Sequence, residues 1–510
     1  FPYPGRSPVM TPNAMASTSH PLSTAAALDI LQQGGNALDA ATAAVAVQCV
    51  VEPQSTSIGG DCFCLYAPAD RDEVIAINGS GRAPSGMEAS WLREQGFDSI
   101  PQQSPHSVTV PTAVDAWATL NRDHGKMSLA DILAPSIGYA RDGYAITPRV
   151  AFDFAGCFDL LQGDGDASDV FLPEGRSLEA GDAHRQPALA RTLSEIAEKG
   201  RDGFYKGWVA EDMLAKLNGL GGTHTQADLD NALATYVTPI KTNYHGYDIW
   251  ECPPNGQGLI ALLLLNMAEG MDKFGTHPIN LQRIHHEIEA GRLAYRDRSL
   301  FLGDPDFVDV PTETLIGKDY AAQISAMIDP HQAMHPLPDC PLPRHKSTVY
   351  ISVVDKDRNA CSFINTVYHS FGAGLVAPQS GVLFQCRGMG FTLEEGHPNC
   401  IAPNKRPLHT IIPGMVKQSG RTVMPFGVMG GEYQAFGHMQ FLSRLLDYGM
   451  DIQEAQDCPR FFPDPFSNDV EIEAPISDEL FEALKKMGHH VIRPAKPVGG
   501  SQGIWIVNVW

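Results

Sequence analysis

Residues 25–31, rich in alanine and leucine, form the first strong helical pattern of the chain. Ser23 and Thr24 precede this pattern, and glycines at 34–35 follow it. Hydroxyl residues are common helix caps at the start and glycine at the end. The sequence therefore predicts a helix that begins near Ser23 and stops before the two glycines.

Further elements follow the same kind of pattern. Residues 37–51 predict a second helix, and because residues 40–47 within it are small on every face, we expect it to be packed tightly against a sheet. Helices are also predicted over 128–142 and 284–298, each with a charged outer face, and a strand over 247–251.

A hairpin is predicted in the second half of the chain. Residues 348–355 and 360–366 both alternate, and the short polar stretch 356–359 between them is typical of a turn. The preceding segment, 330–347, is rich in proline, which favours an extended, exposed path. We therefore interpret 330–347 as a linker that ends at the first strand of the hairpin.

Composition and charge limit the kinds of partner that we expect for this protein. The chain has 510 residues, 43% of them hydrophobic, which is enough to bury a large core. A formal net charge of −22 argues against nucleic acid or an anionic membrane surface as a partner. The longest apolar run, 259–265, is far shorter than the roughly 20 residues of a membrane helix. A small-molecule substrate is the expectation.

The termini and cysteines bear on location. Residues 1–6 contain neither a basic stretch nor an apolar one, so we expect a cytoplasmic protein, or a periplasmic one if a signal was removed before residue 1.

Only Cys62 and Cys64 among the ten cysteines lie close together in sequence. That spacing suits neither a disulfide nor a zinc knuckle, so reduced thiols are predicted.

Thr348 opens the predicted hairpin directly after the linker, and that position has a chemical use. Cleavage before Thr348 would place its α-amino group beside its own hydroxyl. An α-amine has a pKa of about 7.7 to 8.0, so part of it is neutral near pH 7 and can accept the hydroxyl proton. One residue would then supply both nucleophile and base. Spacing alone favours a structural threonine here.

Other motifs give weaker signals. Residues 285–287 (His-His-Glu) and 489–490 (His-His) could ligate a metal, but adjacent histidines on a helix point in different directions and no third ligand has suitable spacing. Residues 255–258 are glycine-rich but lack the ending of a phosphate-binding loop. We predict no metal and no cofactor, and interpret 255–258 as a loop near the active site.

A set of ordered motifs extends over nearly the whole chain. Before the linker these are 35–40 (Gly-Asn-Ala-Leu-Asp-Ala), 57–61 (Ser-Ile-Gly-Gly-Asp), 110–114 (Val-Pro-Thr-Ala-Val) and, later, 302–305 (Leu-Gly-Asp-Pro). In the second half they are 347–348 with 352–357, then 371–374 (Phe-Gly-Ala-Gly) and 429–431 (Met-Gly-Gly). With these motifs the chain resembles the γ-glutamyltranspeptidase family of N-terminal nucleophile hydrolases.

The resemblance implies an α+β fold, the four-layer αββα sandwich of N-terminal nucleophile hydrolases. It also implies a precursor that cleaves itself into a large subunit, 1–347, and a small catalytic subunit, 348–510. These two subunits would be each other's partners, and a dimer of heterodimers is compatible with this scheme. Our own pattern of mixed helices and strands agrees with such a fold but does not select it.

The resemblance also assigns catalytic roles, position by position. Thr348 matches the nucleophile, and Thr366 matches the hydroxyl residue that hydrogen-bonds it from the neighbouring strand. Gly430 and Gly431 match the pair whose N–H groups form the oxyanion hole. Glycine suits that role because the backbone must come close to a developing negative charge.

The substrate-binding positions depart from the family pattern. Transpeptidases hold the substrate α-carboxylate with an arginine at the position where this chain has Ser80, although Arg82 lies close by. Their acidic residue for the α-amino group is replaced by Gly390, and a usual serine pair by His409 and Thr410. The pocket therefore lacks the features that recognise a glutamyl group.

Arg387 adds a positive charge to the same segment as Gly390. A guanidinium pairs bidentately with a carboxylate. Together with His409 it predicts an anion-binding pocket and a small carboxylate-bearing amide such as oxamate, as in the acylase-like branch of the family. Three alternatives stay open: a γ-glutamyl transferase or hydrolase, a cephalosporin or glutaryl acylase, and a non-catalytic relative.

Overall fold

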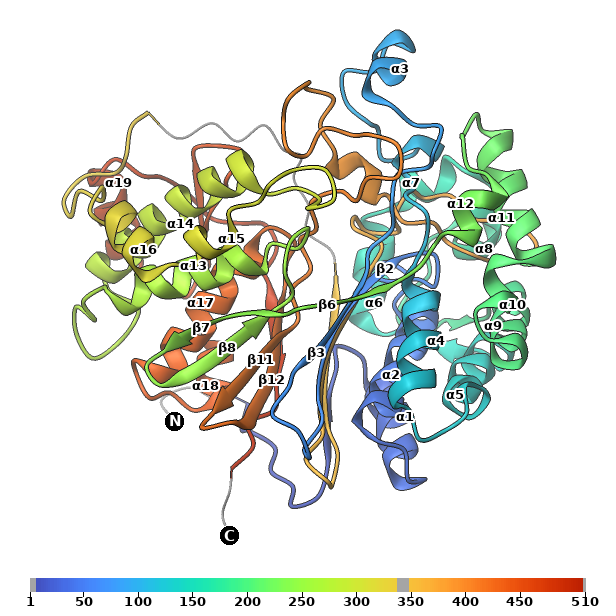
Figure 1. The fold of residues 1–510 in the computed structure, drawn as a ribbon, viewed down its shortest axis with the longest axis horizontal. Coiled ribbons are helices and arrows are strands. Elements are labelled where there is room, and N and C mark those ends of the chain that lie inside the picture. Colours follow the sequence, from blue (N-terminus) through green and yellow to red (C-terminus); the bar gives the residue numbers. More distant parts are fainter. Residues whose placement is uncertain (1–5, 337–347, 508–510) are drawn as a thin grey trace.

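The protein has four layers, with helices outside and two sheets inside (Figure 1). A computed structural model describes residues 6–336 and 348–507. One sheet has six strands and the other five, and strand β12 of the second contacts β9 and β10 of the first. Helices cover the outer face of each sheet (Figure 1). The four-layer αββα sandwich of the α+β class is thus confirmed.

The six-stranded sheet is antiparallel and contains the predicted hairpin. In spatial order its strands are β1 (Met15–Ser17), β9 (Val349–Val354), β10 (Ala360–Thr366), β2 (Asp61–Ala67), β3 (Ile75–Gly79) and β6 (Thr235–Val237). The two hairpin strands are fully buried, because helices cover one face of the sheet and the second sheet covers the other. The prediction of a buried hairpin after residue 347 is confirmed.

The five-stranded sheet is also antiparallel. Its strands in spatial order are β16 (Gly500–Gly503), β12 (Arg421–Met429), β11 (Gly414–Gln418), β8 (Tyr247–Glu251) and β7 (Ile240–Tyr244). Strand β8 confirms the strand predicted over 247–251. Phe63, Tyr350, Ile364 and Met415 fill the space between the two sheets.

Helix α2 (Ala37–Val51) packs on strands β9 and β10, and all of its residues are buried. Its small residues allow α1 (Pro21–Gln32) and α5 (Leu129–Asp142) to pack closely against its other faces. The predictions for 37–51 and 128–142 are confirmed. Helix α4 (Ala113–His124) contributes to the same layer by covering β2 and β3.

The start of α1 differs from the prediction. The side chain of His20, not Ser23 or Thr24, caps this helix by accepting the N–H of Leu22 at 3.2 Å. Pro21 occupies the first helical position, where its missing N–H has no consequence. The Ser23 hydroxyl donates instead to the carbonyl of Ala44 at 2.9 Å, so it joins α1 to α2.

The outer helical layer of the second sheet consists of α13 (Gly258–Glu269), α14 (Leu281–Phe301) and α17 (Tyr433–Leu446). The predicted charged outer face of the helix over 284–298 is wrong, because most charged side chains of α14 are buried. They pair within the helix, as Arg283 does with Glu287 at 2.5 Å and Arg292 with Glu289 at 2.8 Å. Helix α13 covers one side of α14, while α19 (Asp478–Lys486) and β13 (Phe461–Pro463) cover another.

The remaining elements surround these layers. They are α3 (Ala89–Glu94), η1 (Pro105–Ser107), β4 (Tyr144–Ala145), α6 (Pro148–Ala155), α7 (Phe158–Gln162), α8 (Gly165–Phe171), η2 (Pro173–Gly175), β5 (Ala183–His184), α9 (Pro187–Lys199), α10 (Asp202–Tyr205), α11 (Gly207–Gly219), α12 (Gln226–Asp230), α15 (Thr312–Leu315), α16 (Lys318–Ser325), η3 (Arg387–Gly390), α18 (Ile452–Asp457), β14 (Asp469–Ile472) and β15 (His490–Ile492). None of the helices in the described ranges is long and apolar enough to cross a membrane.

The predicted linker is only partly described. Residues 330–336 lie beside the C-terminal part of the chain, where the Ala333 N–H donates to the Met487 carbonyl at 2.7 Å. The rest of the linker, 337–347, lies outside the described residues.

Candidate active site

The ends of four neighbouring strands bring the site residues together. Thr348 directly precedes β9, Thr366 ends β10, Asp61 begins β2 and Ser80 follows β3. The register pairs Thr366 with Asp61, so the two residues lie side by side at the same edge of the sheet. All four residues are buried. Their common edge forms the floor of the candidate site.

Among the described residues, the side chains of Thr366 and Gln434 contact the Thr348 hydroxyl. Its Oγ1 lies 3.5 Å from Oγ1 of Thr366, and Nε2 of Gln434 donates to it at 3.5 Å. The Thr366 oxygen also accepts the backbone N–H of Tyr368 at 3.0 Å, which fixes its position. The two threonines predicted to work together are thus neighbours, despite belonging to different strands.

Gly430 and Gly431 form the turn between β12 and α17. Their φ angles are 133° and 59°, a region that L-residues with a side chain rarely adopt. A Cβ on Gly430 would lie 2.8 Å from the carbonyl oxygen of Val498, so the turn also has no room for one. Glycine is therefore needed here for backbone shape, and at Gly430 also for lack of space.

Two glutamines contact this turn, Gln257 with its side chain and Gln434 with its backbone N–H. The Gln257 side chain donates to the carbonyls of Gly431 at 3.3 Å and Thr410 at 2.8 Å. Gln434, in the first turn of α17, accepts the Ile412 N–H at 3.2 Å with its oxygen, which directs its NH₂ group to Thr348. Gln257 lies in the loop 255–258, whose predicted place near the active site agrees with these contacts.

Arg387 is fully buried at the start of η3. Its guanidinium carbon lies 3.9 Å from the ring centroid of Tyr368, and Nη1 donates to Oγ1 of Thr410 at 3.3 Å. Among the described residues its Nε and Nη2 have no hydrogen-bond partner. Burial lowers the pKa of this guanidinium, while nearby Tyr368 and Asp61 raise it. A buried cation with two open donors is suited to receive an anion.

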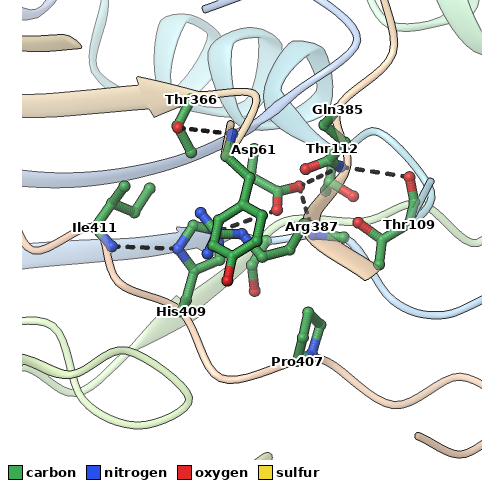
Figure 2. Close-up of polar contacts among 12 residues, drawn as sticks. Asp61, Thr109, Thr112, Thr366, Gln385, Arg387, Pro407, His409 and Ile411 are labelled. Carbon is green, nitrogen blue, oxygen red and sulfur yellow. Dashed lines mark hydrogen bonds and ion pairs between the residues drawn. The ribbon is translucent and has the colours of Figure 1, made fainter. Parts of the chain in front are cut away.

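Asp61 and His409 lie beside Arg387 and form a buried pair (Figure 2). Nε2 of His409 lies 3.0 Å from Oδ2 of Asp61, and its Nδ1 accepts the Ile411 N–H at 3.4 Å. Burial and the positive charge of Arg387 lower the pKa of His409 to about 4, so the ring is neutral near pH 7. Its N–H then lies on Nε2 and donates to Asp61.

The structure places Ser80 and Arg82 differently from these residues. The Ser80 hydroxyl donates to Oδ1 of Asn78 at 2.7 Å and accepts from Nδ2 of Asn255 at 3.2 Å, so it belongs to a buried polar network. Arg82 is half-buried and pairs with Asp304 at 3.3 Å and Asp306 at 2.8 Å. Both of its Nη atoms are occupied by these carboxylates, away from Thr348.

A buried ion pair lies next to the turn of Gly430 and Gly431. Glu432 directly follows Gly431 and pairs with Arg298, which also donates to Oε1 of Gln257 at 2.8 Å. Burial raises the pKa of Glu432, while Arg298 and Arg387 lower it. No local sequence pattern indicates this pair, because Arg298 comes from α14, far from Glu432 along the chain.

One histidine cluster could ligate a metal ion. His285, Glu289 and His489 bring their ligand atoms within 4.8 Å of one another. However, Nδ1 of His285 lies 2.8 Å from Nε2 of His489, its Nε2 lies 2.7 Å from the Asp329 carbonyl, and Glu289 pairs with Arg292. Most of these groups already have partners. Local spacing could not reveal the cluster, since His489 comes from the other end of the chain.

Sequence reasoning missed three residues of the site. Asp61 was part of a motif but had no role, and neither Tyr368 nor Gln434 was singled out. A weak signal existed for Gln434, since it is a polar residue in the buried first turn of α17, four positions after Gly430. The partners of Asp61 and Tyr368 depend on chain crossings that no local pattern reports.

The four-layer αββα sandwich with a threonine directly before a central strand is the arrangement of N-terminal nucleophile hydrolases. The family model described as gamma-glutamyltranspeptidase matches residues 23–509. The chain therefore belongs to the gamma-glutamyltranspeptidase family, whose relatives are hydrolases of amide bonds.

Three relatives illustrate the range of the family. A glutathione hydrolase-like proenzyme YwrD from Bacillus subtilis is 35% identical and covers 94% of this chain and 91% of its own. An oxamate amidohydrolase proenzyme from Klebsiella pneumoniae is 32% identical with the same coverage, 94% and 91%. The crystal structure of a cephalosporin acylase from Bacillus halodurans is 37% identical, with a TM-score of 0.93 over 99% of this chain and 94% of that one.

Proposed function

We propose that this hydrolase matures by cutting itself before Thr348 and then cleaves a small amide whose acyl part carries a carboxylate, as oxamate does. The observation that carries the substrate class is Arg387, a buried guanidinium with two donors that no described residue uses. Leaving such a group without a partner is unfavourable, and a substrate carboxylate would supply the missing acceptors bidentately.

The contacts around Thr348 support its role in maturation. The Thr348 hydroxyl attacks the carbonyl carbon of residue 347, the peptide C–N bond breaks, and the nitrogen leaves as the α-amine of Thr348. Water then hydrolyses the ester that has formed. The products are a large subunit, 1–347, and a small subunit, 348–510.

Turnover would use the same oxygen. The α-amine takes the hydroxyl proton while Oγ1 of Thr348 attacks the substrate amide, and the backbone N–H groups of Gly430 and Gly431 receive the oxyanion. The C–N bond breaks, and the amine leaves with the proton. Water completes the cycle by hydrolysing the acyl-enzyme. Thr366 and Gln434 hold the nucleophile at 3.5 Å each.

The direct experiment compares amides. Purified protein would be given oxamate, a γ-glutamyl anilide and a glutaryl amide, and release of ammonia or amine would be measured. We expect the carboxylate-bearing amides without an α-amino group to be cleaved best. Preferred cleavage of the γ-glutamyl anilide, accelerated by a dipeptide acceptor, would support a transferase instead.

Two further results would test the assignments. On a denaturing gel we expect two bands, the smaller beginning with Thr348, and a single band in an active preparation would refute this nucleophile.

Arg387→Ala should raise KM for oxamate about 10-fold or more and leave KM for the uncharged oxamide nearly unchanged, because an ion pair is lost on binding. Arg82→Ala is the matched control, since its partners lie elsewhere.

A second candidate is an acylase with a longer acyl group, favoured by the likeness to the cephalosporin acylase structure. Assays with the glutaryl amide distinguish this acylase from an enzyme that prefers oxamate. A kcat/KM for the glutaryl amide well above that for oxamate would select the acylase.

A further inference from the structure

Asp61 lies beside Arg387 (Figure 2). In the described part of the structure, however, the two side chains do not form an ion pair. The Asp61 carboxylate instead accepts hydrogen bonds from three other donors, and both of its oxygens have a partner. Its Oδ1 accepts the Gly81 N–H and the Gln385 side-chain N–H, each at 2.8 Å, and its Oδ2 accepts from His409 at 3.0 Å. The nearby carboxylate is therefore occupied while the cation is left open.

His409 is the only one of these three donors that reaches Oδ2. The ring is held from the other side by the Ile411 N–H at 3.4 Å, and it packs against Phe63 with ring centroids 4.9 Å apart. Both of its nitrogens thus have partners. This geometry does not suit a residue that binds substrate directly.

A buried carboxylate oxygen that loses its donor must find another, because unpaired charge in a low-dielectric interior is strongly unfavourable. Without His409, the cation available to Oδ2 would be Arg387, which lies close enough for Asp61 to affect its pKa. An Asp61–Arg387 ion pair would then occupy the donors that a substrate carboxylate needs.

We infer that His409 is a positioning residue for specificity: by holding Oδ2 of Asp61, it keeps Asp61 away from Arg387 and leaves the guanidinium open to an anionic substrate. The inference rests on the proposed function, because it assumes that Arg387 binds the carboxylate. It assigns to His409 an indirect role, in place of direct contact with the substrate.

The test uses four variants of the full-length protein, with KM and kcat measured for oxamate and for oxamide. His409→Leu removes the donor, and His409→Gln retains an N–H that can reach Asp61. His409→Leu/Asp61→Asn removes the donor and the competing charge together. Arg387→Ala reports on the proposed function itself. Thermal unfolding of each variant confirms that it is folded, and His409→Met replaces the leucine variant if that one is not.

We expect His409→Leu to raise KM for oxamate about 10-fold with little change for oxamide. His409→Gln should stay within about 3-fold of the parent, and the double variant should recover most of the lost affinity for oxamate. The recovery is the decisive result, since a merely structural role for His409 predicts that the second substitution adds damage.

Two outcomes overturn the inference and are distinguishable from failure of the proposed function. If Arg387→Ala raises KM for oxamate selectively but His409→Leu does not, Arg387 binds the anion without help from His409. If His409→Leu weakens both substrates equally and Asp61→Asn does not rescue it, His409 has only a structural role. If Arg387→Ala itself affects oxamate and oxamide alike, the proposed function fails instead.

Discussion

The site has two walls built in different ways. We call one the nucleophile wall, formed by Thr348, Thr366, Gly430, Gly431 and Gln434, and the other the recognition wall, formed by Arg387, Tyr368, Thr410, Asp61 and His409. The nucleophile wall consists of hydroxyls, amides and backbone groups, without a charged side chain. The recognition wall contains the buried cation of Arg387, the buried carboxylate of Asp61 and the ring of His409, which hydrogen-bonds to that carboxylate.

In our proposal, the nucleophile wall carries out the reaction and the recognition wall selects the substrate. The nucleophile wall keeps the family motifs, since the same attack on an amide serves every substrate. The recognition wall departs from them at Arg387, His409 and Thr410, and we propose that its buried charges select the acyl group. Changes to the first wall should therefore affect kcat for all substrates, and changes to the second should affect KM for some.

The largest expected effect is on the nucleophile wall. Thr348→Ala should leave a folded, full-length precursor without amidase activity, because the same oxygen is needed for maturation and turnover. Thr348→Ser keeps that oxygen, so slow maturation and reduced turnover are expected. Mass spectrometry follows the cleavage and ammonia release the activity. Cleavage and full activity in Thr348→Ala would disprove the assignment.

The oxyanion turn should come next. Gly431→Ala places a side chain at a φ of 59°, and the shifted N–H groups should lower kcat roughly 100-fold for charged and neutral amides alike. Gly449→Ala is the matched control, since Gly449 has a φ of 67° and no atom would touch the new Cβ. Equal losses of kcat in both variants would mean that general backbone strain, and not the oxyanion hole, is responsible.

The recognition wall should show a pH dependence of stability. The pKa of His409 is about 4 in the folded protein and near 6.5 when unfolded, so the unfolded chain binds the proton first as the pH falls. The free energy of unfolding should therefore drop between pH 6.5 and 4, by on the order of 3 kcal/mol from this group. Urea unfolding at several pH values measures it. His409→Gln should remove this part of the slope, and an unchanged slope would contradict the neutral, buried histidine.

The smallest effect is expected for Gln434. Gln434→Met removes the donor to Thr348 with little change in volume, and we expect kcat to fall about 10-fold with KM nearly unchanged. Gln440→Met provides the comparison, because Gln440 is equally buried on the same helix but bonds Tyr433 and Phe461. It should lose stability and keep kcat. If the two variants lose kcat equally, Gln434 does not act on the nucleophile.

The two helical layers show where sequence patterns suffice. Helix α2 was predicted with its bounds and its burial, because small apolar residues on every face admit only a packed helix. Helix α14 was predicted as a helix, but its charged face was assigned to solvent. Two of its arginines, Arg283 and Arg292, pair with glutamates of the same helix within a covered layer, and whether a charged face is covered depends on elements distant in sequence.

The sequence by itself determined the local elements, the hairpin that Thr348 opens and, through motif resemblance, the nucleophile wall except for Gln434. Hydrophobic periodicity reports which face of an element is apolar, and motifs report residues that act at fixed spacing. Only the tertiary structure decided how the recognition wall is paired, because Asp61, Arg387 and His409 come from separate segments of the chain. Whether Arg387 is open or paired depends on how Asp61 is held, and that competition exists only once these segments are packed together.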